Sequence, residues 1–171
     1  PLPDLPTEAA TAGADDVEPP VLADDFHDAQ SATDVGNWLG DVNPNYTGEF
    51  DDPYSVNCGK CAESVFNKFE GNPDVAAAGQ GTYTTPEMQD ATGVEQVPMS
   101  PSEIEQALVD GGPGSHALIG VDWEGGGGHW YNAYYDGDKV WAVDGQTGEI
   151  SPWPGVDPAT VKTWDAGIKT K

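Results

Sequence analysis

The sequence predicts an α+β fold in which a helix that begins at a cysteine packs against an antiparallel sheet. Helical patterns occupy residues 58–69 and 100–111, and the chain after residue 114 consists of strand-like runs separated by turn residues. The sequence contains no repeat of about 20 to 50 residues, which argues against a solenoid or a propeller.

The first helix is predicted from the spacing of its apolar side chains. These recur at intervals of three and four residues, as on one face of an α-helix, at Cys58, Cys61, Ala62, Val65, Phe66 and Phe69. Asn57 occupies the position of an N-cap, and the breakers at 71–73 end the helix.

The second helix is predicted from its start signal. Ser100–Glu103 matches a capping box with Pro101 at the first helical position, and Gly111 with the following glycine closes the helix. Elsewhere we expect a short helix or docked segment within residues 25–39, and a Gly- and Thr-rich loop over residues 78–98.

Four strands are expected after the second helix, because β-branched and aromatic runs alternate there with turn residues. They cover residues 115–123, 129–135, 139–144 and 149–153. Asp136-Gly137-Asp138, between the second and third strands, is typical of a hairpin turn.

The register of this hairpin decides which side chain lies opposite His129. A turn centred on Asp136-Gly137 pairs His129 with Asp144, whereas a turn centred on Gly137-Asp138 pairs it with Gln146. Cross-strand partners lie roughly 5 Å apart at Cβ, within reach of an imidazole hydrogen bond. Because Asp144 and Gln146 share one face of the strand, either register leaves both near the imidazole.

Cys58, His129 and one of these orienting groups form the pattern of an activated thiol. A thiol at a helix N-terminus is favoured as thiolate by the helix dipole, and the unpaired backbone N–H groups there can hold an oxyanion. His129 directly follows the glycine run 125–128, whereas His27 lies in an acidic segment and His116 has no evident partner. In such a site the imidazole takes the thiol proton and the third residue fixes its tautomer.

The charge of the chain excludes several classes of partner. Thirty Asp and Glu residues face six lysines and no arginine, which gives a net charge of −24. Nucleic acids and anionic lipids would repel this polyanion, so we expect neither as a partner. No apolar run of about 18 residues predicts a membrane span. The charge is spread over the whole chain, which favours a halophilic or salt-tolerant source over a basic partner.

The N-terminal region differs in composition from the rest. Residues 1–25 are rich in Pro, Ala, Asp and Glu and contain no aromatic residue, so we expect an acidic Pro/Ala-rich linker or partly ordered arm over residues 1–40. Residues 41–171 then form the catalytic domain. The chain starts at Pro1 without a signal peptide, and we interpret it as an excised part of a longer polypeptide.

Several blocks of the sequence together match one known pattern. In chain order they are Asn43-Pro44, Asn57-Cys58 at a helix start, the segment PGSHALIGVDWEGG, a glycine run followed by His129 and Asn132, and VDGQTGEI at 143–150. With these blocks, about residues 40–153 resemble the papain-fold toxin domains of the protein-glutamine deaminase type, which occur at the C-termini of polymorphic bacterial toxins.

The resemblance implies a papain-like cysteine-hydrolase fold over residues 41–171 and a Cys58–His129–Asp144 catalytic triad. Asn57, or backbone N–H groups near Cys58, would line the oxyanion hole. The further candidates are Gln146 as an orienting group and Gly127, Gly128 and Trp130 beside the substrate.

The implied activity is deamidation of glutamine side chains in a target protein. Cys58 thiolate attacks the carboxamide, ammonia leaves with a proton from His129, and water converts the thioester to glutamate. Such a domain would be secreted or delivered as the C-terminal part of a larger toxin, with an immunity protein as a further candidate partner. We expect no cofactor and no metal.

Other interpretations remain open on the sequence alone. A cysteine peptidase or a transglutaminase-like acyl transferase would use the same nucleophile, and a non-catalytic binding module is an alternative from another class. Cys58 and Cys61 also form a CxxC motif typical of redox proteins, although turn-like residues rather than a strand precede it. A zinc site would need two more ligands, and no second CxxC or histidine pair supplies them.

Overall fold

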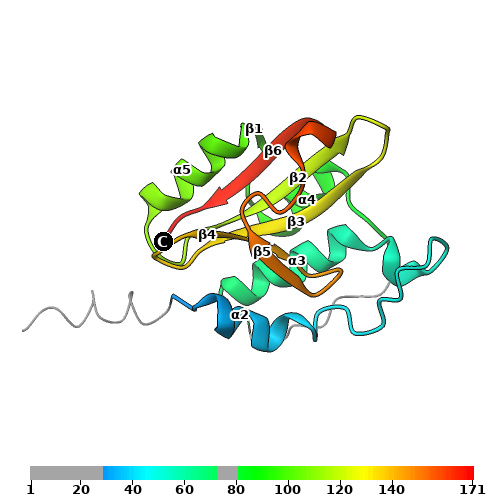
Figure 1. Cartoon of the computed structure of the whole chain (residues 1–171), viewed down its shortest axis with the longest axis horizontal. Helices are drawn as coiled ribbons and strands as arrows, with labels where there is room; N and C mark the ends of the chain where they lie inside the picture. The colour runs from blue at the N-terminus through cyan, green and yellow to red at the C-terminus, as the bar shows by residue number, and fades with distance from the viewer. Residues whose placement is uncertain (1–28, 73–80) are drawn as a thin grey trace, which may run out of the picture.

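An antiparallel sheet forms the centre of the structure, a computed structural model that describes residues 29–72 and 81–171 (Figure 1). Within these residues the sheet has six strands in the order β1-β6-β2-β3-β4-β5. Their bounds are Val97–Pro98 (β1), His116–Trp123 (β2), Gly128–Tyr135 (β3), Val140–Asp144 (β4), Glu149–Pro152 (β5) and Val161–Lys169 (β6). The four strands predicted from the sequence are β2 to β5.

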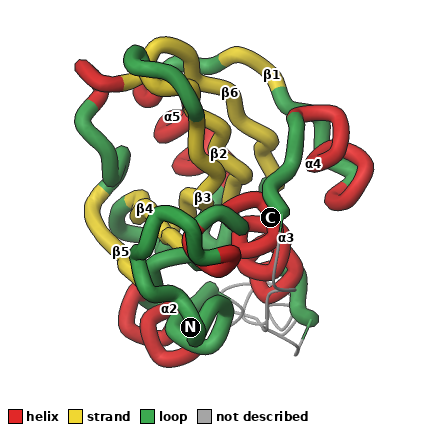
Figure 2. Tube along the Cα trace, turned by 90° about the vertical axis from the view of Figure 1, so that its right-hand side faces the viewer, coloured by secondary structure: helices red, strands yellow, loops and turns green. Residues whose placement is uncertain are grey.

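Helices cover both faces of this sheet. The described α-helices are α2 (Ala32–Leu39), α3 (Cys58–Phe69), α4 (Thr85–Thr92) and α5 (Pro101–Gly111), with 3-10 turns η2 (Pro53–Ser55) and η3 (Pro158–Thr160). Figure 1 shows α5 on one side of the sheet and α3 with α2 on the other. In Figure 2, α2 lies near β5 and α4 nearer to β1, toward opposite edges of the sheet. This arrangement confirms the α+β class.

Alternating strand residues divide the core into two layers. Ile119 and Val121 of β2 face α5 and pack against Leu108. Leu118, the residue before Ile119, faces the other way and packs with Phe66 of α3. Among the described residues, no helix has the length and apolar character needed to cross a bilayer.

Helix α3 confirms the predicted apolar face. All six residues of the predicted series are buried, and Gly59 is buried with them. Asn57 stands at the N-cap, but its side chain makes no capping hydrogen bond. Only its backbone oxygen caps the turn, by accepting from the N–H of Cys61 at 3.1 Å. The side-chain amide instead bonds to Asn43 and Gln146, as described for the site below.

The predicted loop over residues 78–98 is wrong, because helix α4 lies within it. Thr84 and Glu87 form a capping box, and Pro86 stands in the first turn. Only Met88 of this helix is buried. The apolar periodicity is therefore weak, and the start signal carried more information than the spacing did.

The hairpin between β3 and β4 has one of the two predicted registers. Asp136 pairs with Lys139, and Asn132 pairs with Val143, as expected for a turn centred on Gly137-Asp138. The alternative centred on Asp136-Gly137 is wrong. The Asp136 carboxylate accepts the backbone N–H groups of residues 138 and 139, which fixes the turn one residue later along the chain.

Helix α2 confirms the helix expected within residues 25–39. Ser31 caps it through a capping box with Asp34. Val35 and Leu39 are fully buried and pack with α3, so this helix belongs to the core. The predicted arm over residues 1–40 otherwise falls mostly on residues 1–28, outside the described part.

Strand β6 was not predicted. It lies between β1 and β2 and pairs with β2 along most of its length. Its sequence, VKTWDAGIK, has no strict alternation of apolar and polar residues, so a pattern of period two does not reveal it. It places Asp165 beside the pocket described next.

Candidate functional site

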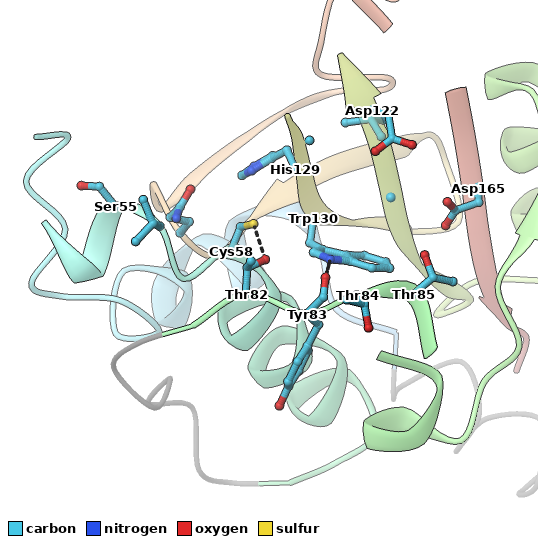
Figure 3. Close-up of a pocket in the computed structure, with 15 residues that line it drawn as sticks. Ser55, Cys58, Thr82, Tyr83, Thr84, Thr85, Asp122, His129, Trp130 and Asp165 are labelled. Atoms are coloured by element: carbon cyan, nitrogen blue, oxygen red, sulfur yellow. Dashed lines mark hydrogen bonds between the residues drawn. The ribbon is translucent and has the colours of Figure 1, made fainter. Parts of the chain in front are cut away.

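Cys58, His129 and Asp144 are the first residue of α3, the second residue of β3 and the last residue of β4. The β3–β4 ladder stops at Asn132 and Val143, so His129 lies beyond its last paired residue. There its Nε2 lies 2.8 Å from Oδ2 of Asp144. Figure 3 shows the imidazole and the sulfur of Cys58 close to each other at one end of a pocket.

The turn that follows β4 holds the Asp144 carboxylate in place. Oδ1 accepts the backbone N–H of Gln146 at 2.9 Å and that of Thr147 at 3.3 Å. Oδ2 is thereby directed to His129. An Asp followed by a tight turn is suited to this double role, because its side chain can bind backbone groups two and three residues ahead.

Gly145 lets the same turn lie against the thiol helix. A Cβ at this position would stand 2.7 Å from Cγ2 of Val65 and 3.1 Å from the backbone oxygen of Cys61. Only glycine therefore allows this approach without displacing the neighbours. The contact links Asp144 to the helix that carries Cys58.

Three buried amides connect the two halves of the site. Nδ2 of Asn57 donates to Oδ1 of Asn43 at 3.1 Å, and Oδ1 of Asn57 accepts from Nε2 of Gln146 at 3.3 Å. Asn43 also donates to the backbone oxygens of Tyr54 and Gln146, at 2.7 and 3.0 Å. The network joins the residue before Cys58 to the turn after Asp144, which explains why an Asn upstream of the cysteine belongs to the pattern.

The electrostatics of the site favour a charged pair. Burial opposes ionisation of the Cys58 thiol, but the hydrogen bond and positive charge of His129, with smaller contributions from Thr82 and Trp130, lower its pKa below the usual 9.0. Burial likewise disfavours the imidazolium, but Asp144 and Cys58 raise the pKa of His129 to about 10. The surroundings of both groups therefore favour a thiolate–imidazolium pair over a neutral thiol and imidazole.

The second cysteine has a different environment. Cys61 packs in the core with Val35, Leu39 and Val65. Burial and the negative charge of Asp144 raise the pKa of its thiol to about 12. Both cysteines are free thiols in the structure. A neutral, buried thiol is a poor nucleophile, so only Cys58 is activated.

A cavity of about 410 Å³ opens in front of Cys58 and His129. It extends past Trp130 to the carboxylates of Asp122 and Asp165 (Figure 3). Nε2 of Gln96 donates to Oδ1 of Asp165 at 2.6 Å. This volume is sufficient for a glutamine side chain together with part of its polypeptide.

The predicted neighbours of the substrate divide into two groups. Gly128 and Trp130 line the cavity, whereas Gly127 is not one of its lining residues; Gln146, predicted as an orienting group, lines the cavity as well. Trp130 is buried, and its Nε1 donates to the backbone oxygen of Tyr83 at 2.7 Å. The Trp130 side chain thus holds the loop at Tyr83 over the site and also forms part of the cavity wall.

Some lining residues escaped the sequence analysis. Thr82, whose Oγ1 lies 3.2 Å from Sγ of Cys58, stands in a segment that shows no motif. Asp122 and Asp165 are indistinguishable by sequence from the many solvated acids of the chain. The capping box at Thr84 was the available signal that an ordered element lies next to this loop.

His116 has a partner that the sequence did not reveal. It is fully buried against Phe66 and Phe69, with its Nε2 2.6 Å from Oε2 of Glu70 at the end of α3. This histidine lies in the core and not in the cavity. In the described part of the chain, no group of three or more His, Cys, Asp or Glu side chains could hold a metal ion.

Comparison with known families agrees with the geometry. A family model described as papain fold toxin 1, glutamine deamidase, matches residues 56–149, more than half of the chain. The matched range begins just before Cys58 and extends past Asp144. A comparison with curated proteins finds no significant match. The resemblance noted in the sequence and the papain-like fold are thus confirmed: the chain belongs to the papain-fold toxin family of glutamine deamidases.

Proposed function

We propose that this domain deamidates glutamine side chains of a target protein through a thioester on Cys58. The observation that carries the proposal is the placement of an imidazole–carboxylate pair, 2.8 Å apart, next to a thiol at a helix N-terminus. All three groups stand at one cavity or directly behind it. The pKa of Cys58 is lowered and that of His129 is raised, which supports a nucleophile that ionises more readily than an ordinary thiol.

The proposed reaction has two halves. In the first, Sγ of Cys58 attacks the carboxamide carbon, and the C–N bond breaks as His129 gives its proton to the leaving nitrogen, so that ammonia departs. In the second, His129 takes a proton from water, the resulting hydroxide attacks the thioester, and the C–S bond breaks. The products are a glutamate side chain and the free thiolate. Asp144 holds the imidazole in one orientation and stabilises its positive charge.

We assign Asn57 to positioning and not to the oxyanion hole. Its amide nitrogen donates to Asn43 and its oxygen accepts from Gln146, so both ends of the amide are engaged away from the sulfur. Gln146 acts in the same way, because its backbone N–H holds Asp144. The backbone N–H of Cys58, at the start of α3, is the donor that remains from the sequence analysis.

Among the alternatives, the redox interpretation has the least support. A CxxC pair needs two thiols that react with each other, and Cys61 is buried in the core with its pKa raised to about 12. A peptidase would use the same nucleophile but attack a backbone amide bond. An acyl transferase would also use it, but would pass the acyl group to an amine instead of water. Family membership favours deamidation, so the experiment must identify the product.

Mass spectrometry of candidate target proteins tests the proposal. Candidates are incubated with wild type or with Cys58→Ala, digested and analysed. A gain of about one mass unit on a glutamine, only with wild type, supports deamidation. Backbone cleavage would assign a peptidase, and a primary amine bound to glutamine would assign an acyl transferase. Modification that persists with Cys58→Ala would refute a cysteine mechanism.

We further propose that the domain is delivered as part of a larger toxin, with an immunity protein that blocks the cavity. The family supports an effector that acts on a protein target. Co-expression with a neighbouring open reading frame provides the test. Protection of cells that carry wild type, together with loss of Cys58 alkylation in the complex, supports the assignment; protection without any complex would contradict it.

A further inference from the structure

The structure places the hydroxyl group of Thr82 next to the nucleophile. Its Oγ1 lies 3.2 Å from Sγ of Cys58, and the two atoms face each other at the end of the cavity (Figure 3). Thr82 comes from the segment before α4 and not from any of the three elements that carry Cys58, His129 and Asp144. Neither the motif pattern nor the triad assigns it a role.

The backbone around Thr82 is held against the thiol helix by several contacts. A Cβ on Gly59 would stand 2.5 Å from the backbone nitrogen of Tyr83, so the segment lies directly on the first turn of α3. Nε1 of Trp130 donates to the backbone oxygen of Tyr83 at 2.7 Å, and the Tyr83 hydroxyl donates to Oε1 of Glu63 at 2.6 Å. The position of the Thr82 hydroxyl is thereby fixed before any substrate binds.

An oxyanion hole needs preorganised donors around the oxygen that becomes negative. In the tetrahedral intermediate this oxygen is two bonds away from Sγ of Cys58. A donor that contacts Sγ in the resting state is therefore within hydrogen-bonding reach of the oxygen after a small rotation. Asn57 is less suited to this role, because its amide is held between Asn43 and Gln146.

We propose that Thr82 is a catalytic residue whose hydroxyl donates to the oxyanion in both halves of the reaction. It completes the oxyanion hole together with the backbone N–H of Cys58. In the resting site the same hydroxyl donates to the thiolate. No proton is transferred from Thr82 at any stage, since the hydrogen bond only moves from sulfur to oxygen and back. This inference rests on the proposed cysteine mechanism.

Two variants separate this role from stabilisation of the thiolate. Thr82→Val keeps the shape and removes the donor, and Thr82→Ser keeps the donor. Alkylation of Cys58 by iodoacetamide forms no oxyanion, so its rate reports the thiolate. Butyraldehyde, whose chain resembles the glutamine side chain, adds reversibly to Cys58 and gives an oxyanion-like adduct. Its affinity is measured from the concentration at which it protects Cys58 against alkylation. Ammonia release from N-acetylglutamine methylamide reports turnover.

We expect Thr82→Val to lose about 10²- to 10³-fold in kcat/KM and to bind butyraldehyde at least tenfold more weakly. Its alkylation rate should fall by less than tenfold, and Thr82→Ser should stay within a few-fold of wild type in all three assays. Thr82→Ala, with a melting curve as the folding control, replaces Thr82→Val if that variant misfolds.

Two results would overturn the assignment. Turnover and aldehyde affinity of Thr82→Val within threefold of wild type would show that the hydroxyl is not needed. Equal losses in the alkylation rate and in turnover would show that Thr82 only stabilises the thiolate and does not contribute to the oxyanion hole. A wild-type protein that neither releases ammonia nor reacts at Cys58 would instead refute the proposed function itself, together with this inference.

Discussion

Removing the charge of Asp144 should change the reactivity of Cys58 by a predictable amount. The pKa of His129 rises from 6.5 to about 10 despite burial, because Asp144 and Cys58 both stabilise the imidazolium. At 1.36 kcal/mol per pKa unit, this difference corresponds to about 5 kcal/mol. If Asp144 supplies half of this stabilisation, Asp144→Asn destabilises the thiolate–imidazolium pair of Cys58 and His129 by about 2.5 kcal/mol.

The rate of Cys58 alkylation as a function of pH measures this effect. In wild type the pKa of Cys58 lies below its usual 9.0 and the imidazolium persists to about pH 10, so iodoacetamide should react faster at pH 6.5 than with an ordinary thiol. In Asp144→Asn the pKa of His129 falls and that of Cys58 rises, so the rate at pH 6.5 should drop roughly 50- to 100-fold. The two profiles should converge at high pH, where the thiol ionises without the imidazolium.

Asp138→Asn is the matched control, because it removes one negative charge from an exposed position at the far end of the same β3–β4 hairpin. It should leave the profile unchanged. An Asp144→Asn profile that coincides with that of wild type would refute the claim that Asp144 maintains the ion pair. A similar drop in Asp138→Asn would show that overall charge, not the contact with His129, controls the thiol.

The other predictions concern the second thiol, the turn after β4 and the buried histidine. Iodoacetamide at pH 7 should label Cys58 and leave Cys61 unmodified. Cys61→Ala should keep at least a third of the wild-type activity. Loss of all activity in Cys61→Ala would instead favour the CxxC redox interpretation. Gly145→Ala should destabilise the fold by about 1–3 kcal/mol and slow the alkylation of Cys58. Gly36→Ala, at a position in open space on α2, should leave the stability unchanged or raise it by up to about 1 kcal/mol. Equal melting temperatures for the two variants would contradict the close packing at Gly145. Burial lowers the pKa of His116 to about 4, below the 6.5 of the unfolded chain. Between these two pH values the unfolded state binds more protons than the folded state. Acidification from pH 7 to 5 should therefore lower the melting temperature. The slope should be shallower in His116→Gln, and identical slopes would argue against the buried neutral imidazole.

The sequence was informative where one local signal determined the structure. The spacing from Cys58 to Phe69 is the apolar face of α3, and the capping box at Ser100 is the start of α5. Asp136-Gly137-Asp138 indicated the hairpin but left two registers, because the choice depends on which backbone groups the Asp136 carboxylate binds. Both registers bring Asp144 close to His129, so the triad hypothesis did not depend on the choice.

What the sequence could not predict depends on contacts between distant segments. Thr82 reaches Cys58 only because Gly59 and Trp130 hold the chain around Tyr83 on α3, and nothing in residues 81–84 indicates this. Asn57 was a reasonable oxyanion candidate until its amide was found bonded to Asn43, fourteen residues earlier. Strand β6 takes its place from pairing with β2 and not from its own pattern.

Trapping the acyl-enzyme tests whether the reaction passes through a thioester on Cys58. Hydroxylamine added during the reaction competes with water for the thioester, so a target glutamine should become a hydroxamate as well as glutamate. Hydroxamate should form on the same glutamine that wild type deamidates, and none should form with Cys58→Ser or without enzyme. Deamidation by wild type that never yields hydroxamate, even at hydroxylamine concentrations that react with free thioesters, would contradict a Cys58 thioester.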